Sequence, residues 1–309
     1  MKSGVPQSKF IKVNGINLHY LDWGGQGTVL LFLTGLGNSA YIYGSIAPRF
    51  ADRFHVIALT RRGHGDSDCP ETGYDIETLT DDIDQFMTEL EIDKAIIAGH
   101  SMSNLEMCHL SSLHPEKITK LVFIDANYDR ASESFQAMVR LNPLRSIQIP
   151  GLDDEHKDME DYFASLKKSY PEFDSIWGDV LEEDVEHCMT KNQEGTIVDK
   201  MSSTASQALY TTLRSCSPED AALTMPVLSF FAIKPPDFFL SKDYMDADQR
   251  SSVIDYFTNI LPPLQKVEIE KFHQAVPHAR IVEVPKGHHY CFIKNEKLVY
   301  EEMCNFLEE

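Results

Sequence analysis

The segment AIIAGHSMSN, residues 95–104, decides the fold. Four apolar residues typical of a buried strand lead into a Gly-His-Ser turn, and a stretch of helical character follows. A sharp turn between a strand and a helix strains the backbone of its central residue and lifts that side chain clear of the main chain. The pattern therefore predicts that Ser101 is a nucleophile. The alternative is an ordinary turn serine, because Ser103 stands where the G-x-S-x-G pattern has its last glycine.

Apolar runs typical of strands buried on both faces alternate with helical patterns along most of the chain. The runs are TVLLFLTG (28–35), FHVIALT (54–60), KAIIAG (94–99), KLVFIDA (120–126), PVLSFFA (226–232) and RIVEVP (280–285). Amphipathic helices are expected at 76–90 and at the end of the chain, and a hairpin is expected around Asn14-Gly15. This order predicts an α/β fold with a mostly parallel central sheet and helices on both faces.

The alternation stops between residues 129 and 223, where apolar residues follow helical spacing only. We therefore expect an inserted helical cap at 129–223 and a core made of residues 1–128 and 224–309. Residues 151–200 hold 15 acids and 5 bases, so this insertion is expected to have a solvated outer face. A second insertion, at about 236–276, is expected to carry a helix that stops at Pro262-Pro263.

The charge of the chain restricts its partners. There are 48 acidic and 28 basic residues, which give a net charge of −20. This charge repels phosphate backbones and anionic lipid, so we expect no nucleic-acid partner, no membrane partner, and a small neutral or cationic substrate. Neither a leader-like apolar run in MKSGVPQSKF nor a spanning stretch of about 18 apolar residues is present, so a cytoplasmic location is expected.

Sequence motifs for cofactors are missing. The six cysteines form no C-x-x-C pair, which favours packed, reduced thiols. Histidines and acids do not cluster at metal-ligand spacing, and neither G-x-G-x-x-G nor G-x-x-x-x-G-K occurs. We therefore expect no metal, no nucleotide and no other cofactor.

Several motifs together resemble the α/β-hydrolase superfamily, over nearly the whole chain outside the cap. They are LFLTGLGNSAYIYG (31–44), RRGHGDSD (61–68), GHSMS (99–103), HPEKITKLVFIDA (114–126) and VEVPKGHHY (282–290). More narrowly, the elbow region looks like a bacterial subgroup without a defined substrate. The resemblance implies that Ser101 is the nucleophile and that the backbone N–H groups of Leu36 and Met102 form the oxyanion hole. Thr34 replaces the histidine common in the oxyanion loop.

The resemblance leaves two candidates for the general base. The usual family spelling places the histidine directly after a glycine, which selects His288. The spacing to Phe306-Leu307 in the closing helix selects His289 instead, and we prefer His289. Only one of two adjacent imidazoles can reach the hydroxyl of Ser101.

Two aspartates are candidates for the acid that orients this base. Asp125 ends the 120–126 run, and Asp237 lies in the longer loop AIKPPD (232–237). Both positions can reach the carboxyl edge of the sheet. We prefer Asp125, because it lies on regular secondary structure. Glu106, His64 and His100 are expected to have structural or pocket-lining roles.

These residues predict a serine hydrolase that cleaves an ester or related acyl bond through an acyl-enzyme on Ser101. A hydrophobic pocket beneath the cap is expected to set specificity. One alternative is a cofactor-free lyase or dioxygenase on the same fold, since a fold does not determine a reaction. The other is a non-catalytic ligand-binding homologue.

Overall fold

The computed structural model describes residues 4–149, 154–241 and 243–309. Within these ranges, one main sheet has eight strands in the order β1-β2-β4-β3-β5-β6-β9-β10. Its strands are β1 (Gln7–Val13), β2 (Ile16–Gly24), β3 (Val29–Leu33), β4 (His55–Leu59), β5 (Ala95–His100), β6 (Ile118–Ile124), β9 (Val227–Ile233) and β10 (Arg280–Pro285). The pairs β1–β2 and β2–β4 are antiparallel, and the other pairs are parallel. The predicted mostly parallel sheet is confirmed, as is the hairpin at Asn14-Gly15.

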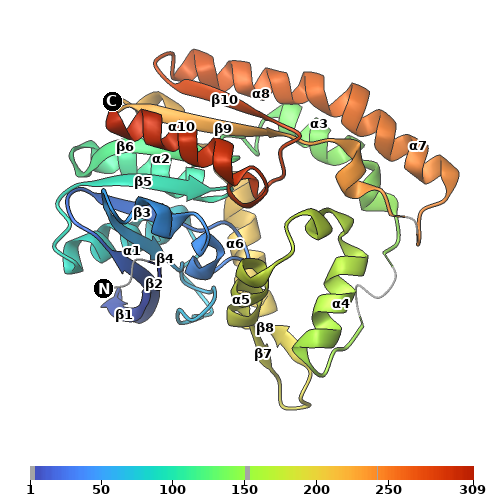
Figure 1. Cartoon of the computed structure of the whole chain (residues 1–309), viewed down its shortest axis with the longest axis horizontal. Helices are drawn as coiled ribbons and strands as arrows, with labels where there is room; N and C mark the ends of the chain where they lie inside the picture. The colour runs from blue at the N-terminus through green and yellow to red at the C-terminus, as the bar shows by residue number, and fades with distance from the viewer. Residues whose placement is uncertain (1–3, 150–153, 242) are drawn as a thin grey trace.

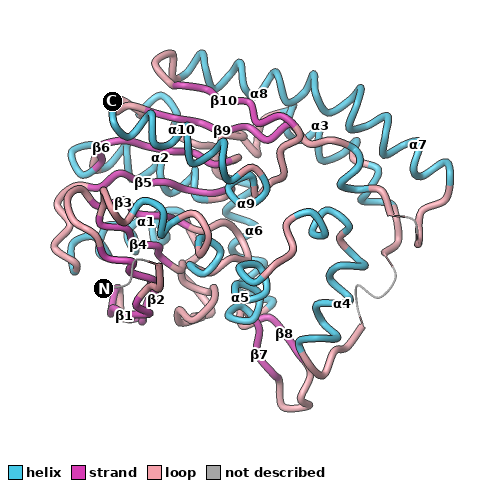
Figure 2. Tube along the Cα trace, viewed as in Figure 1, coloured by secondary structure: helices cyan, strands magenta, loops and turns pink. Residues whose placement is uncertain are grey.

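Helices cover both faces of this sheet (Figures 1 and 2). The α-helices of the described residues are α1 (Ile76–Glu89), α2 (Ser103–Leu113), α3 (Glu133–Leu141), α4 (Met159–Ser169), α5 (Asp179–Cys188), α6 (Ser203–Ser215), α7 (Ala247–Asp255), α8 (Leu261–Ala275), α9 (Cys291–Lys294) and α10 (Glu296–Glu308). Apolar residues of α1, α2 and α8 pack on one face of the strands, whereas those of α10 pack on the other. The predicted helix at 76–90 and the closing helix are confirmed.

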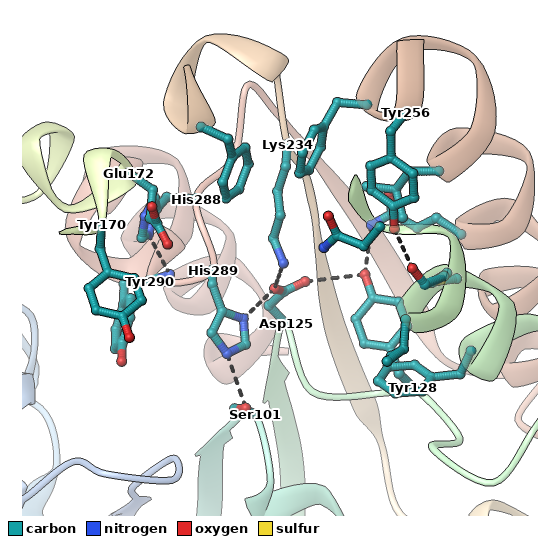
Figure 3. Close-up of a pocket in the computed structure, with 18 of the residues that line it drawn as sticks. Ser101, Asp125, Tyr128, Tyr170, Glu172, Lys234, Tyr256, His288, His289 and Tyr290 are labelled. Atoms are coloured by element: carbon teal, nitrogen blue, oxygen red, sulfur yellow. Dashed lines mark hydrogen bonds and ion pairs between the residues drawn. The ribbon is translucent and has the colours of Figure 1, made fainter. Parts of the chain in front are cut away.

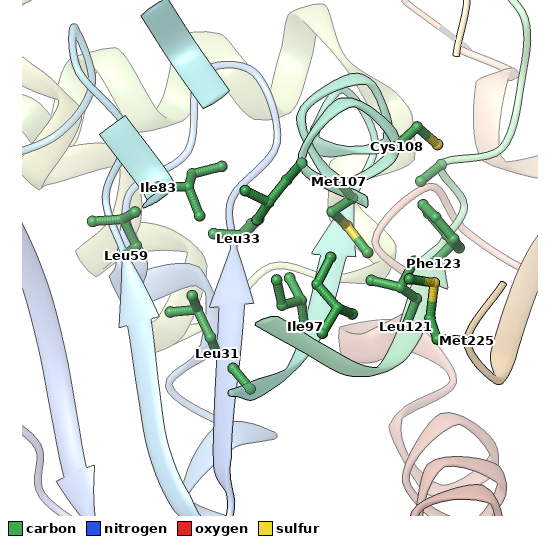
Figure 4. Close-up of a cluster of buried hydrophobic side chains, with 14 of the residues drawn as sticks. Leu31, Leu33, Leu59, Ile83, Ile97, Met107, Cys108, Leu121, Phe123 and Met225 are labelled. Atoms are coloured by element: carbon green, nitrogen blue, oxygen red, sulfur yellow. The ribbon is translucent and has the colours of Figure 1, made fainter. Parts of the chain in front are cut away.

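Successive residues along each central strand belong in turn to two hydrophobic clusters, one on each face of the sheet. In β3, Leu31 and Leu33 belong to the cluster shared with α1 and α2, whereas Leu30 and Phe32 belong to the cluster on the opposite face. Figure 4 shows the first cluster around Leu31, Leu33 and Ile97. Because successive strand side chains point to opposite faces, a strand buried on both faces must be apolar without interruption. This explains the continuous apolar runs in the sequence.

The segment between β6 and β9 is largely helical and carries α3 to α6. It also contains the short antiparallel strands β7 (Met189–Lys191) and β8 (Ile197–Asp199), which the sequence did not predict. Helix α3 packs along α8, on the side of the segment away from α4 and α5 (Figure 2). Residues 150–153 of the expected cap lie outside the described residues.

The prediction that a helix stops at Pro262-Pro263 is wrong. Helix α7 passes through a π-helical turn, Tyr256–Ile260, directly into α8. Both prolines lie in the first turn of α8, where a helix tolerates proline because the first N–H groups have no partner within it. Helix α7, the π-helical turn and α8 therefore form one long helical segment that includes both prolines.

Candidate active site

Ser101 occupies a strained turn between β5 and α2. Its φ of 56° lies in the left-handed region that residues with a Cβ rarely adopt. The turn is tight: a Cβ on Gly99 would lie 2.3 Å from Oγ of Ser103. Ser103 is fully buried, and its hydroxyl donates to the carbonyl of His100 at 2.9 Å. Ser103 therefore closes the turn and does not present a second hydroxyl to the pocket.

The structure brings Ser101, His289 and Asp125 into one hydrogen-bonded chain (Figure 3). The Nε2 atom of His289 lies 3.0 Å from Oγ of Ser101, and its Nδ1 lies 2.6 Å from Oδ2 of Asp125. The carboxylate can only accept, so Nδ1 carries the proton and Nε2 is free to accept one from the serine. This arrangement can activate the hydroxyl of Ser101 for attack.

Asp125 receives hydrogen bonds on both carboxylate oxygens. Oδ1 accepts from the backbone N–H of Ala232 at 2.9 Å and from the hydroxyl of Tyr128 at 3.3 Å. Oδ2 faces His289 and the ammonium of Lys234, whose Nζ is 3.3 Å away. Burial raises the pKa of Asp125, but Lys234 and His289 outweigh this effect and hold the pKa below its ordinary value. Asp125 is therefore a permanent anion beneath the imidazole.

The loop that carries His289 is supported from below by His100. Nε2 of His100 donates to the carbonyl of His289 at 3.0 Å, and the two rings lie 4.4 Å apart. Burial lowers the pKa of His289, the hydrogen bond to Asp125 raises it, and Lys234 lowers it again. The net pKa lies below the usual 6.5, so His289 is the neutral base at pH 7.

The other two candidates do not reach Ser101. His288 is buried in the cavity wall, and its Nδ1 accepts the backbone N–H of Tyr290 at 3.0 Å. Burial, with Lys234 and His289 nearby, lowers the pKa of His288 to about 3. Asp237 lies in the short turn Pro236–Phe239, outside the cavity lining, and makes no hydrogen bond to His289. The geometry thus favours His289 over His288 and Asp125 over Asp237.

Leu36 lines the same cavity as Ser101, and Met102 directly follows Ser101 in the chain. Within the described part of the chain, neither residue's backbone N–H group donates to another protein atom. The loop carrying Leu36 is held by Arg61, whose guanidinium donates to the carbonyls of Thr34 and Gly35. Arg61 is itself held by the buried carboxylate of Glu106. Glu106 therefore has the structural role that the sequence predicted, and the two N–H groups are available to an oxyanion.

A carboxylate from the inserted segment holds the same loop from the other side. Asp184 on α5 is fully buried and accepts from the N–H and hydroxyl of Ser39, each at 2.7 Å, and from the amide of Asn38 at 2.8 Å. Burial raises the pKa of Asp184 to about 7, against the lowering effect of these donors. The inserted segment is thereby fastened to the loop that presents Leu36.

A cavity of about 540 Å³ opens above Ser101. Its walls come from the sheet edge, from both insertions and from the His289 loop, and most of its side chains are apolar or aromatic. Besides tyrosines, Asp125 and three histidines, the described ionisable residues of its lining are Arg130, Glu172 and Lys234. Burial raises the pKa of Glu172 to about 7. Such a cavity is suited to a small organic molecule.

Two further features bear on the kind of site. Among the described residues, no three His, Cys, Asp or Glu side chains are grouped so that they could hold a metal ion. Within the same ranges, no helix is both long and apolar enough to cross a bilayer.

A family model described as "alpha/beta hydrolase fold" matches residues 28–296. The chain belongs to this family. A 2-(acetamidomethylene)succinate hydrolase of Mesorhizobium japonicum is 32% identical over 114 residues, which cover 37% of this chain and 41% of that one. A soluble epoxide hydrolase of a Corynebacterium species is 30% identical over 131 residues, covering 42% and 46%. These alignments thus span less than half of each relative.

The structural similarity extends over the whole α/β-hydrolase fold. The crystal structure of an E-2-(acetamidomethylene)succinate hydrolase superposes with a TM-score of 0.74, covering 98% of this chain and 100% of that one at 23% identity. This agreement confirms the fold class.

Three residues near the site were missed in the sequence. Lys234 lies within the AIKPPD loop, Arg130 follows β6, and Asp184 lies in the acid-rich part of the insertion. A lysine three residues before the candidate acid Asp237 was a usable signal. Asp184 had none, because its partners Asn38 and Ser39 are distant in the chain, and Arg130 had none, because the cavity around it is formed by segments distant in the chain.

Proposed function

We propose that the protein is a serine hydrolase that cleaves an ester or amide-like bond of a small molecule through an acyl-enzyme on Ser101. The observation that carries this proposal is the hydrogen-bonded chain from Ser101 through His289 to Asp125 at the floor of the cavity. The name of the Mesorhizobium relative, which denotes hydrolysis of an acetamido compound, is consistent with cleavage of an acyl bond.

In the first half-reaction, Oγ of Ser101 attacks the carbonyl carbon while Nε2 of His289 takes the hydroxyl proton. The carbonyl π electrons move onto oxygen, and the N–H groups of Leu36 and Met102 donate to that oxyanion. When the carbon–heteroatom bond breaks, His289 gives its proton to the leaving group. Asp125 keeps the imidazolium in place during this step.

In the second half-reaction, water takes the place of the leaving group. His289 removes a proton from the water, whose oxygen attacks the acyl carbon. Collapse of the intermediate releases the carboxylic acid and returns the proton to Ser101. We further propose that segment 129–223 acts as a cap, because its residues Tyr170, Glu172 and Phe173 line the cavity above these atoms.

Epoxide hydrolysis, which the name of the Corynebacterium relative denotes, fits this nucleophile poorly. A serine that opened an epoxide would form an ether, and water does not cleave an ether under these conditions. A carboxylate nucleophile would instead form an ester that water can hydrolyse. The hydroxyl at Ser101 therefore favours acyl chemistry.

The test is the Ser101→Ala variant. We expect it to lose turnover of a short-chain ester such as 4-nitrophenyl butyrate by at least about 10⁴-fold, because removal of the nucleophile removes most of the acceleration. It should also lose labelling by a fluorophosphonate. Both are measured on protein whose circular dichroism spectrum matches the wild type.

Ser103→Ala is the matched control, since this hydroxyl is buried in the same turn and should be dispensable for labelling. Ester turnover that persists in Ser101→Ala would exclude the proposed nucleophile. A wild-type protein that resists the fluorophosphonate would favour the ligand-binding alternative. Labelling without any ester or amide turnover would favour the lyase or dioxygenase alternative.

A further inference from the structure

A second cavity, which we call the arginine groove, adjoins the active-site cavity. Four arginines contribute to its lining, together with six residues that carry no charge. The arginines are Arg130, Arg140, Arg145 and Arg214, and the uncharged residues are Leu36, Phe135, Gln136, Val139, Tyr210 and Leu213. No acidic side chain lines it within the described residues. In a chain of net charge −20, such a surface is an exception that calls for a ligand of negative charge.

The two cavities share four lining residues, among them Leu36 and Arg130. Leu36 presents one of the two proposed oxyanion N–H groups. Arg130 comes five residues after Asp125, so it lies near the carboxyl edge of the sheet and reaches both spaces. An anionic group held by Arg130 would therefore lie beside a carbonyl placed over Ser101.

Arg130 lacks the partners that other buried arginines have. Arg61 pairs with Glu106, and Arg62 donates to both oxygens of Asp82. The partly buried side chain of Arg130 makes no hydrogen bond or ion pair with any described residue, and its nearest aromatic ring, that of Phe135, is 5.5 Å from the guanidinium. Burial lowers the pKa of Arg130, against the raising effect of Asp125.

The other cation of the cavity is already occupied. Lys234 is 3.3 Å from Asp125, and that ion pair belongs to the Ser101–His289–Asp125 chain. Among the described residues that line the active-site cavity, Arg130 is thus the arginine or lysine that remains open to a ligand. A guanidinium binds a carboxylate through two parallel hydrogen bonds. Its single positive charge matches the single negative charge of a carboxylate, whereas a phosphate monoester carries about −1.5 to −2 at pH 7.

Building on the proposed hydrolase function, we propose that the substrate carries a carboxylate, which Arg130 binds while the scissile carbonyl lies over Ser101. Arg145 and Arg214 of the groove attract the anion toward this position, whereas Arg140 is already paired with Glu133. This inference differs from the neutral or cationic substrate that net charge alone suggested, because a ligand in the groove would meet its arginines and not the summed charge of the chain.

The test compares matched 4-nitrophenyl esters. Half-esters of succinate, glutarate and adipate are paired with butyrate, valerate and hexanoate, in which a methyl group replaces the distal carboxylate. Background hydrolysis is subtracted with Ser101→Ala. We expect the wild type to favour at least one half-ester over its neutral partner in kcat/KM. Arg130→Met should lower kcat/KM for that half-ester by about ten- to a hundredfold, the usual loss for a charge-assisted hydrogen bond.

Under the same conditions, Arg130→Met should leave the neutral ester within about twofold of wild type, and Arg130→Lys should retain part of the preference. Lys297→Met is the matched control for charge, because Lys297 is exposed on α10 and remote from both cavities. Equal slowing of both esters by Arg130→Met would overturn the proposal and assign Arg130 a structural role. No preference for any half-ester would also overturn it, while Ser101-dependent turnover of neutral esters would leave the hydrolase proposal standing.

A binding measurement separates the two proposals if no ester is turned over. Succinate, glutarate and adipate are titrated into the Ser101→Ala protein by calorimetry, with and without Arg130→Met. Binding that Arg130→Met weakens about tenfold or more would support carboxylate recognition and would leave only the hydrolase proposal in doubt. Absence of binding, or binding that is equal in both proteins, would overturn carboxylate recognition.

Discussion

At the scale of single residues, the site depends on which of two neighbouring histidines faces Ser101. His289 bonds Ser101 and Asp125, whereas His288 accepts a backbone N–H and lines the wall. Adjacent side chains in a loop point in different directions, so the two cannot exchange roles without rebuilding the loop.

We therefore expect His289→Ala to lower kcat as severely as Ser101→Ala, by at least about 10⁴-fold, because the serine then has no base. His288→Ala should retain measurable turnover of 4-nitrophenyl butyrate. The reverse ranking, in proteins with matching circular dichroism spectra, would transfer the role of base to His288.

The positive charge of Lys234 affects the pKa of His289. The base works only when His289 is neutral, and its pKa lies below the usual 6.5. Activity should therefore fall as the pH drops through a value below about 6.5. Because Lys234 lowers the pKa of His289, Lys234→Met should raise that pKa and move the acid limb of kcat/KM to higher pH.

The profile is measured with neutral 4-nitrophenyl butyrate, so that charge on the substrate does not enter. Lys266→Met, an exposed lysine on α8, is the control and should not move the limb. An acid limb that stays in place or moves to lower pH in Lys234→Met would show that the ammonium does not depress the pKa of His289.

At the scale of elements, the inserted segment and the core meet through a buried hydrogen-bond network. Asp184 on α5 holds the N–H and hydroxyl of Ser39 and the amide of Asn38, next to Leu36 in the chain. Arg61, which is paired with Glu106, donates to the preceding carbonyls of the same loop. The loop is thus fastened on both sides of the N–H that we propose for the oxyanion.

Removal of the carboxylate of Asp184 should displace the backbone N–H of Leu36. We expect Asp184→Ala to lower kcat by about ten- to a hundredfold, somewhat less than the direct loss of an oxyanion donor. It should also lower the free energy of unfolding by about 2–4 kcal/mol, because buried donors lose their acceptor. Kinetics and urea unfolding measure the two effects.

Glu186→Ala provides the control on the same helix, since Glu186 is exposed. Its kcat and stability should remain close to wild type. A stability loss in Asp184→Ala without any change in kcat would mean that the position of Leu36 does not depend on this network.

At the scale of the whole molecule, acidic residues outnumber basic ones. The net charge of −20 produces self-repulsion in the compact state. Salt screens such repulsion over a distance that shrinks from about 30 Å at 10 mM to about 8 Å at 150 mM. Buried pairs such as Arg61–Glu106 are screened far less.

We therefore expect the midpoint of thermal unfolding to rise when NaCl is increased from about 10 mM to about 150 mM. Differential scanning calorimetry at constant pH measures this shift, and KCl serves as a control for specific ion effects. A midpoint that falls with both salts would indicate that surface ion pairs contribute more than the net repulsion.

How much the sequence could predict differs between the fold and the site. Strand positions were predictable because continuous apolar runs such as TVLLFLTG require burial on both faces. The missed hairpin β7–β8 has only three residues in each strand, too few for a period-two pattern to stand out. The helix across Pro262-Pro263 was missed because proline within a helical pattern usually ends the helix. In the structure, both prolines lie in the first turn of α8, where proline is tolerated.

By itself, the sequence determined the sheet, the family and the turn that carries Ser101, because local patterns of apolar residues and glycines encode them. Only the tertiary structure distinguished Asp125 from Asp237 and brought Lys234, Arg130 and Asp184 to their places. These contacts join residues up to 164 positions apart, as between Asp125 and His289. Such pairs leave no periodic signal in the chain, since they form only where the ends of separate strands meet at one edge of the sheet.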